Sequence, residues 1–386
     1  MDIMQESLAL HRKLNGKIEI KNKVKLNDMH DMTLAYTPGV ARACLVIKDY
    51  PEEVFELTSK RNTVAVISDG TAVLGLGDIG PLAAIPVMEG KCALFKRFAN
   101  VDAIPIVLNT KNVDEIVETI YRLSPSFGGI NLEDISAPRC FEVEKRLREL
   151  CDIPVFHDDQ HGTAIVCGAA LLNALKLVHK KLSQVKIVIN GAGSAGIAIT
   201  KFLLELGARH ITVCDRFGIL VEGDSKLNSA QAEIAELTNR KKQNGLLEDV
   251  MKGSDVFIGV SAGNIVSETM VSSMNQDAIV FPMANPTPEI SRDLALKAGA
   301  RVVGTGASNL PNQINNSLIF PGLFRGALDS RVKQISTAME IAACKALAGI
   351  VKKDELSELY IIPSIFNKKV VKRVSKAVMN AACKNS

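Results

Sequence analysis

Two pairs of adjacent acidic residues, Glu133-Asp134 and Asp158-Asp159, each follow a short apolar run. If these runs are neighbouring parallel strands, both pairs fall at the carboxyl edge of the sheet, where ligand crevices form. Converging carboxylates repel one another unless protons or a cation intervene, and an all-oxygen set suits Mg²⁺ or Mn²⁺. The pairs together predict a hard divalent metal site, whereas each pair alone is equally well explained as a cap on the following helix. His157 and His161 flank the second pair, and we interpret them as loop residues because two histidines alone do not make a zinc ligand set.

Two further residues have side chains suited to proton transfer. Lys91 lies two residues before the apolar run 93–95, which we interpret as a strand. Burial and a nearby cation would lower its pKa, while a carboxylate such as Asp158 would counter that shift. Tyr36 is one of four tyrosines and precedes a Pro-Gly pair that favours a rigid turn. Taken alone, the lysine is more simply a solvated residue and the tyrosine a packing residue.

A glycine-rich segment after the predicted strand 186–189 has the G-x-G-x-x-G spacing of a dinucleotide-binding turn. The glycines permit a tight turn, close approach of the backbone to a pyrophosphate, and close helix–strand packing, while the helix amino terminus faces the phosphates. An acidic residue ends the next strand, where it would accept from a ribose hydroxyl. Arg216 follows it and suits either a 2′-phosphate or solvent, so NAD and NADP both stay open. The predicted cofactor-binding residues are Gly191, Gly193, Ser194, Ala195, Gly196 and Asp215.

Short β-branched runs alternate with amphipathic stretches from about residue 60, which favours parallel sheets covered by helices. We expect strands at 63–67, 93–95, 104–108, 130–132, 153–156, 186–189, 211–214, 255–260, 278–281 and 301–304, and helices at 113–123, 141–150, 195–206, from 229, and from 336. The predicted fold class is α/β, with two domains that are each a mostly parallel sheet flanked by helices, the second of Rossmann type.

The predicted organisation has three parts. Residues 1–160 form a substrate and metal domain, residues 161–330 form the NAD(P)-binding domain, and residues 331–386 are helices that pack back on the first domain. The first 60 residues lack the strand–helix alternation, so we expect them to pack on the first domain or to form an oligomer contact.

Composition excludes several classes of protein. The 386 residues are 47% hydrophobic with a net charge of +4 and no basic block interleaved with aromatics, which argues against a nucleic-acid partner. The longest apolar run, 164–178, is interrupted by polar residues and is too short to span a membrane. Eight scattered cysteines without a C-x-x-C pair, and an amino terminus unlike a leader, predict a cytoplasmic protein.

These motifs together resemble the malic enzymes, most closely the compact bacterial-type form. The resemblance runs in unbroken order from about residue 30 to residue 330, through segments 36–40, 75–80, 90–91, 133–134, 157–163, 191–196, 284–287 and 315–322. It implies oxidative decarboxylation of L-malate to pyruvate and CO₂, with reduction of NAD or NADP and dependence on Mg²⁺ or Mn²⁺. It also implies a homodimer.

The resemblance assigns roles to single residues. It implies that Lys91 is the general base that takes the malate hydroxyl proton, that Asp158 tunes Lys91, and that Tyr36 is the general acid that protonates carbon 3 of the enol of pyruvate. Its remaining assignments are Glu133, Asp134 and Asp159 as metal ligands, and Asn285 and Asn316 as contacts to the substrate or the nicotinamide region. We also hypothesise that Tyr36 reaches the site of a neighbouring subunit.

Two alternative functions stay open at this point. One is a metal-assisted hydroxy-acid dehydrogenase that stops before CO₂ is lost, and the other is a dinucleotide-binding sensor without turnover. A phosphoryl-transfer enzyme is disfavoured because the sequence has no G-x-x-x-x-G-K-[ST] loop. The choice between NAD and NADP, the metal used, the direction of the reaction and any allosteric effector are not fixed by the residues.

Overall fold

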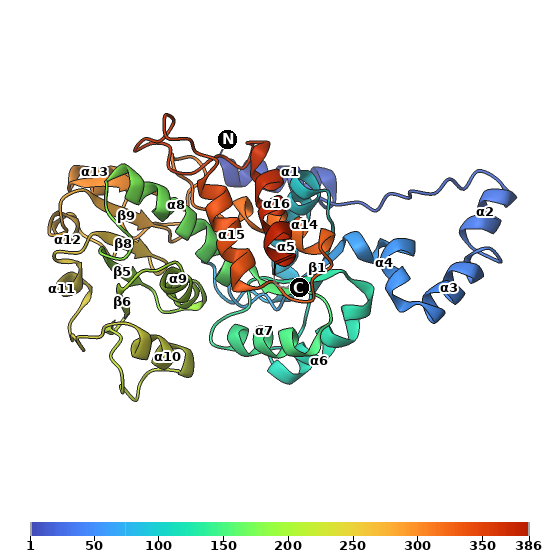
Figure 1. Cartoon of the computed structure of the whole chain (residues 1–386), viewed down its shortest axis with the longest axis horizontal. Helices are drawn as coiled ribbons and strands as arrows, with labels where there is room; N and C mark the ends of the chain where they lie inside the picture. The colour runs from blue at the N-terminus through green and yellow to red at the C-terminus, as the bar shows by residue number, and fades with distance from the viewer. Residues whose placement is uncertain (1, 74, 385–386) are drawn as a thin grey trace.

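Two sheets, one in each half of the chain, organise the computed structural model, which describes residues 2–73 and 75–384 (Figure 1). Leu74 of the glycine-rich loop therefore lies outside the described residues. The first sheet is parallel and has the order β2-β1-β3-β4. Its strands are β1 (Thr63–Ser68), β2 (Asp102–Val107), β3 (Gly129–Leu132) and β4 (Val155–His157).

The second sheet has the order β10-β9-β8-β5-β6-β7, and only its short edge strand β7 is antiparallel. Its strands are β5 (Lys186–Asn190), β6 (His210–Asp215), β7 (Gly218–Ile219), β8 (Val256–Gly259), β9 (Ala278–Pro282) and β10 (Ala300–Val303). The predicted α/β class, with two mostly parallel sheets flanked by helices, is confirmed.

Helices α5 (Pro81–Ala99), α6 (Val113–Leu123) and α7 (Arg139–Leu150) accompany the first sheet. The predicted strand at 93–95 is wrong, because these residues lie inside α5. The buried residues of α5 recur every three or four positions, as on one face of a helix; they are Ala84, Met88, Lys91, Cys92, Phe95 and Ala99. An apolar run of three residues is too short to distinguish a strand from a segment of a buried helix. Lys91 is therefore a helical residue of α5.

Helix α8 (Thr163–Leu177) leads from the first sheet to the second and is buried along most of its length. It packs against α9 (Ser194–Glu205) and against α15 (Thr337–Ala348) of the C-terminal region. The other helices of the second half are α10 (Ser229–Leu237), α11 (Leu247–Met251), α12 (Glu268–Ser272) and α13 (Arg292–Lys297). No helix among the described residues has the length and apolar character required to cross a membrane.

The chain returns to the first half through α14 (Phe320–Asp329), and α16 (Lys369–Ala382) then packs on α14 and α15. Phe95 of α5 contacts the rings of Phe320 and Phe324, with ring centroids 4.7 and 5.3 Å apart. Aromatic pairs at these separations add about 0.5–1.5 kcal/mol each beyond the burial of their surface. This packing brings the C-terminal half against the helix that carries Lys91.

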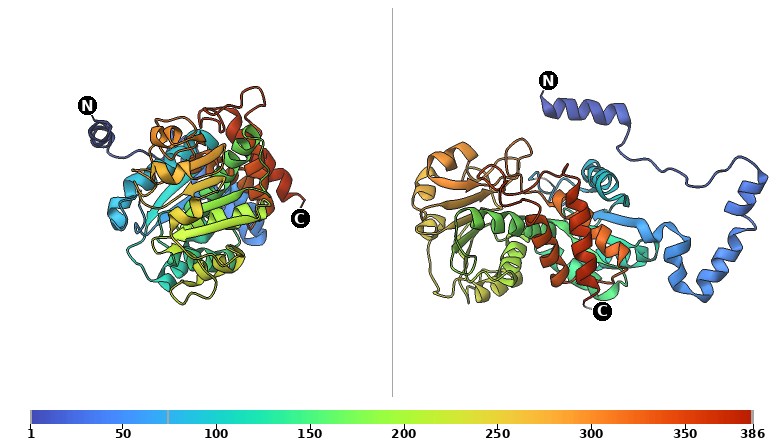
Figure 2. Two further views of the ribbon diagram at one scale, coloured as in Figure 1. Left: turned by 90° about the vertical axis from the view of Figure 1, so that its left-hand side faces the viewer. Right: turned by 45° about the horizontal axis from the view of Figure 1, so that its top comes forward.

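The first 60 residues form an arm that projects from the body (Figures 1 and 2). Helices α1 (Ile3–Leu14), α2 (Met29–Ala35), α3 (Val40–Asp49) and α4 (Val54–Leu57) have no buried residue. Lys17 holds the arm to α5, since its N–H donates to Glu89 Oε2 at 3.0 Å and its Nζ donates to the Pro86 carbonyl at 2.5 Å. Short 3₁₀ turns complete the chain, namely η1 (Pro51–Glu53), η2 (Ser59–Asn62), η3 (Ser124–Ser126) and η5 (Asn316–Leu318).

Candidate active site

The two acidic pairs meet because β3 and β4 are hydrogen-bonded neighbours. Leu132 and His157 are register partners at the last position of each strand, so Glu133 and Asp158 leave the sheet side by side. After β4 the backbone makes one π-helical turn, η4 (Asp158–Gly162), and continues directly into α8. Turns of this type are rare and occur often at functional sites.

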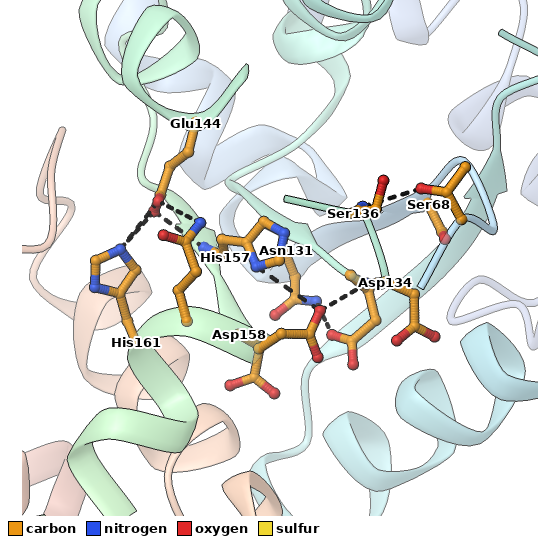
Figure 3. Close-up of polar contacts among 12 residues, drawn as sticks. Ser68, Asn131, Asp134, Ser136, Glu144, His157, Asp158 and His161 are labelled. Carbon is orange, nitrogen blue, oxygen red and sulfur yellow. Dashed lines mark hydrogen bonds and ion pairs between the residues drawn. The ribbon is translucent and has the colours of Figure 1, made fainter. Parts of the chain in front are cut away.

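The two acidic pairs converge, and Glu133, Asp134 and Asp159 from them form a compact cluster. Each offers a carboxylate oxygen, and these three atoms lie within 4.8 Å of one another. The backbone N–H of Asp134 donates to Asp159 Oδ2 at 2.7 Å, whereas Asp134 Oδ2 is buried and has no hydrogen-bond partner among the described residues (Figure 3). A buried oxygen without a partner, within an all-oxygen donor set, fits a hard divalent cation.

The electrostatics of the cluster favour the same cation. Burial, reinforced by Asp159 and Glu133, raises the pKa of Asp134 to about 9. Burial likewise raises the pKa of Asp158 and of Asp159 to about 6. Lys91 is the one lysine or arginine paired with these carboxylates among the described residues, and the raised pKa values mean that holding the full negative charge of the group has a free-energy cost. A divalent cation bound by Glu133, Asp134 and Asp159 would offset that cost.

Lys91 projects from α5 into the same cluster. Its Nζ lies 2.5 Å from Asp158 Oδ2, 2.7 Å from Glu133 Oε1 and 4.3 Å from the centre of the Phe320 ring. Burial lowers the pKa of Lys91, but the carboxylates of Asp158, Glu133 and Asp159 outweigh burial and raise it above the ordinary value. Of the two opposing effects expected from the sequence, the carboxylates dominate in the structure.

The prediction that His157 and His161 are loop residues is wrong. His157 is the last residue of β4 and is fully buried, and neither of its ring nitrogens has a hydrogen-bond partner among the described residues. His161 lies in η4, and its ring binds the carboxylate of Glu144 on α7 at 3.0 Å. Both histidines are therefore part of the packed support behind the acidic cluster.

The glycine-rich turn joins β5 to α9, as predicted. Gly191 has φ +114°, and a Cβ at Gly196 would overlap the carbonyl oxygen of Gly191, so both positions require glycine. A Cβ built on Gly193 would meet no atom within 4 Å, which leaves open space at the amino terminus of α9. Such space beside free backbone N–H groups fits the pyrophosphate of a dinucleotide.

Asp215 ends β6, where the sequence placed it. One of its oxygens accepts the N–H of Phe217 at 2.8 Å, and the guanidinium of Arg216 lies over the Phe217 ring at 4.6 Å. The aspartate is therefore held by its own turn, and the arginine stacks on its neighbour.

Segments from the two halves meet at two close approaches, each of which involves one of the predicted asparagines. Gly75 has φ +74°, and a Cβ there would overlap the carbonyl oxygen of Asn285. A Cβ at Gly162 would lie 3.1 Å from the Cβ of Asn316, next to the turn that carries Asp158. The structure therefore places Asn285 against the loop that contains Gly75, and Asn316 against the turn that carries Asp158.

Tyr36 is the predicted site residue that the structure does not bring to the cluster. It ends α2 on the projecting arm and is 70% exposed, whereas Lys91 is 7% exposed inside the body (Figure 1). Within one chain, the predicted acid Tyr36 and the predicted base Lys91 are therefore apart.

The sequence interpretation missed a buried carboxylate that joins the ends of several strands. Glu289 is fully buried and accepts the N–H groups of Ser261 at 2.8 Å and Ala284 at 3.1 Å. The side-chain amide of Asn190 donates to Ser261 Oγ at 2.8 Å. These contacts tie together the loops that follow β5, β8 and β9, and no local pattern around Glu289 signals them.

The fold and the site together define an NAD(P)-dependent oxidoreductase with a carboxylate cluster suited to a divalent metal. Residues 15–148 match the family model "Malic enzyme, N-terminal domain", and residues 160–385 match "Malic enzyme, NAD binding domain". The chain belongs to the malic enzyme family, whose reaction is the oxidative decarboxylation of malate with NAD or NADP.

Three relatives illustrate the likeness. The NAD-dependent malic enzyme of Geobacillus stearothermophilus is 56% identical, with alignment over 99% of this chain and 79% of that protein. The bifunctional malic/malolactic enzyme of Bacillus subtilis is 54% identical over 99% of this chain and 93% of that protein. The crystal structure of an NAD-dependent malic enzyme from Thermotoga maritima superposes with a TM-score of 0.93 at 49% identity, covering 96% and 98% of the two chains.

Proposed function

We propose that Lys91, Tyr36 and the carboxylate cluster carry out the malic enzyme reaction, converting L-malate and NAD⁺ to pyruvate, CO₂ and NADH. The observation that supports this most strongly is the position of Lys91 Nζ. It lies within 2.7 Å of both Glu133 and Asp158, and Glu133 also belongs to the cluster with Asp134 and Asp159. A base for the C2 hydroxyl and ligands for a metal are thereby adjacent.

The metal would be held by Glu133, Asp134 and Asp159, and when bound it supplies Lewis-acid stabilisation of negative charge on the substrate oxygens. Lys91 must be neutral to act as the base, and a divalent cation held by Glu133, Asp134 and Asp159 would offset the carboxylates that raise its pKa. Neutral Lys91 takes the proton of the C2 hydroxyl while the hydride of C2 passes to the nicotinamide. The C3–C4 bond then breaks, CO₂ leaves, and the phenol of Tyr36 protonates C3 of the resulting enol. Asp158, in contact with Lys91 Nζ, keeps the amine directed at the reacting oxygen.

For the cofactor we propose NAD over NADP. Asp215 lies where a carboxylate accepts a hydrogen bond from the 2′-hydroxyl of the adenosine ribose, and the same negative charge repels a 2′-phosphate. Arg216 is stacked on Phe217. The proposed contacts to substrate or the nicotinamide region are Asn285 and Asn316. The other proposed cofactor-binding residues are Gly191, Gly193, Ser194, Ala195, Gly196 and Asp215.

We propose a homodimer in which each arm covers the other subunit. Of the thirty exposed large apolar side chains in the described part of the chain, seventeen lie between residues 3 and 57. A monomer rarely exposes apolar surface in such a concentration, and a second copy of the chain would bury it. This arrangement delivers Tyr36 of one subunit to Lys91 of the other.

The organisation and location are proposed on the same basis. Residues 1–160 bind metal and substrate, residues 161–330 bind the dinucleotide, and the helices of residues 331–386 pack back on the first domain. A cytoplasmic location fits the cysteines, which are all free in the structure.

The test of function is an assay of purified protein with L-malate, in parallel with NAD and NADP and with and without Mn²⁺. We expect pyruvate and CO₂ in stoichiometric amounts with NAD and Mn²⁺, and little product after chelation. Lactate is measured as well, because the 54% identical relative from Bacillus subtilis is a bifunctional malic/malolactic enzyme. Oxaloacetate without CO₂ would support the hydroxy-acid dehydrogenase, and cofactor binding without turnover would support the sensor.

A further inference from the structure

The carboxylate of Glu144, on α7, accepts hydrogen bonds from three donors of one short segment. It receives the backbone N–H of His157 at 3.1 Å, the side-chain amide of Gln160 at 3.2 Å and Nε2 of His161 at 3.0 Å. Figure 3 shows the side chain of Glu144 pointing from its helix toward His161. The side chain of Glu144 is only 7% exposed, and a buried charge persists only where donors satisfy it. These contacts therefore fix segment 157–161 relative to α7.

The same segment carries two of the acidic side chains of the active site. Asp158 and Asp159 stand between the first and the last donor to Glu144, and η4 has no side-chain cap of its own. Asp158 binds Lys91 Nζ, and Asp159 accepts the N–H of Asp134. A displacement of this one turn would move both carboxylates together, away from Lys91 and from Asp134.

The imidazole of His161 extends the link to the C-terminal region. Its other nitrogen lies 3.4 Å from Glu340 Oε1 on α15, so the ring is held between two buried carboxylates. It also packs on Phe156 of β4, with ring centroids 5.4 Å apart. The row Glu144–His161–Glu340 therefore connects α7, η4 and α15 behind the site.

We propose that Glu144 is a positioning residue of the active site. It does not belong to the cluster of converging oxygens, but it sets where Asp158 and Asp159 stand, and through them the affinity for the metal and the placement of Lys91. This rests on the proposed function of the cluster as a metal site. Groups that orient metal ligands in this way typically change metal affinity by about 10- to 100-fold when they are altered.

The test is Glu144→Gln, which keeps the shape of the side chain but turns an NH₂ group toward the donors. Binding of Mn²⁺ to metal-free protein is measured from the free-ion signal in electron paramagnetic resonance, without malate or NAD. We expect the Kd for Mn²⁺ to rise about 10-fold or more, while the Kd for NAD, measured by fluorescence, stays at the wild-type value. Glu144→Asp keeps the charge with a shorter reach and is expected to show a smaller rise, which provides a second variant if the first folds poorly.

A matched control is Val117→Ala, which removes buried volume from α6 of the same half and leaves the hydrogen bonds of Glu144 to segment 157–161 in place. It should lower the melting temperature and leave the Kd for Mn²⁺ unchanged. Folded Glu144→Gln and Glu144→Asp proteins that bind Mn²⁺ as the wild type does would overturn the proposal while leaving the proposed function intact. Equal weakening in Val117→Ala would also overturn it, because the effect would then be general loosening. A wild-type protein that binds no Mn²⁺ would overturn both proposals.

Discussion

Mixing two inactive variants tests whether the active site is shared between subunits. Tyr36 lies on the exposed arm and Lys91 in the body, so Tyr36→Phe and Lys91→Ala impair different parts of the same proposed site. If the arms are exchanged, a mixed dimer has one site with both residues intact and one site with neither. Random pairing makes about half of the dimers mixed, so we expect roughly one quarter of wild-type activity to return.

The two proteins are co-expressed with different tags, or unfolded and refolded together, and malate-dependent NADH formation is followed. Each variant alone is measured as the baseline. Tyr50→Phe, which removes the phenol of another exposed tyrosine at the end of α3 on the same arm, is the matched control and should keep full activity. Recovery no greater than the sum of the two separate variants, in a preparation shown to contain mixed dimers, would refute the exchange of arms.

Three further outcomes follow from the site. Lys91→Met should lower kcat by roughly 10²- to 10⁴-fold with little change in the KM for NAD, and a change confined to KM would contradict its role as the base. Asp215→Ser should raise the KM for NAD about 10-fold, because a charge-assisted hydrogen bond is lost, while the kcat/KM for NADP rises or stays the same. An unchanged ratio of kcat/KM for NAD to kcat/KM for NADP would disprove the role of Asp215. Burial lowers the pKa of His161, but Glu144 and Glu340 outweigh burial and raise it to about 9 from an ordinary value near 6.5. The protonated ring therefore stabilises the fold fully below pH 6.5 and progressively less up to pH 9, so the free energy of unfolding, measured with urea, should fall across this range less steeply in His161→Gln than in the wild type. Equal slopes would show that His161 does not titrate as described.

The sequence was sufficient where a local pattern determines position. Glu133 and Asp158 were predicted to converge because each follows a strand, and the register of β3 and β4 places them side by side. The turn from Gly191 to Gly196 was predicted because three glycines, a strand and a helix all coincide there. Helix 113–123 was predicted with its observed bounds because its apolar period is regular, and in the structure Asn112 caps it.

The sequence was insufficient where tertiary contacts decide. The run 93–95 is too short to distinguish a strand from part of a buried helix. The spacing of three or four residues between the buried positions from Ala84 to Ala99 did indicate a helix. The buried position of Glu144 could also have been inferred from the sequence, because it lies on the same face of α7 as the apolar residues Val143 and Leu147. Its partner segment comes from another part of the chain, so the position alone did not reveal its role.

The central claim is that the carboxylates after β3 and β4 bind a divalent cation beside Lys91 and that turnover depends on it. The most direct measurement titrates Mn²⁺ into chelator-stripped wild-type protein and follows bound metal and malate oxidation in the same samples, with Asp134→Asn in parallel. We predict one Mn²⁺ per chain in the wild type, activity that returns in proportion to occupancy, and a large loss of both in Asp134→Asn. Full malate oxidation by the stripped protein, or wild-type Mn²⁺ affinity in Asp134→Asn, would contradict the claim.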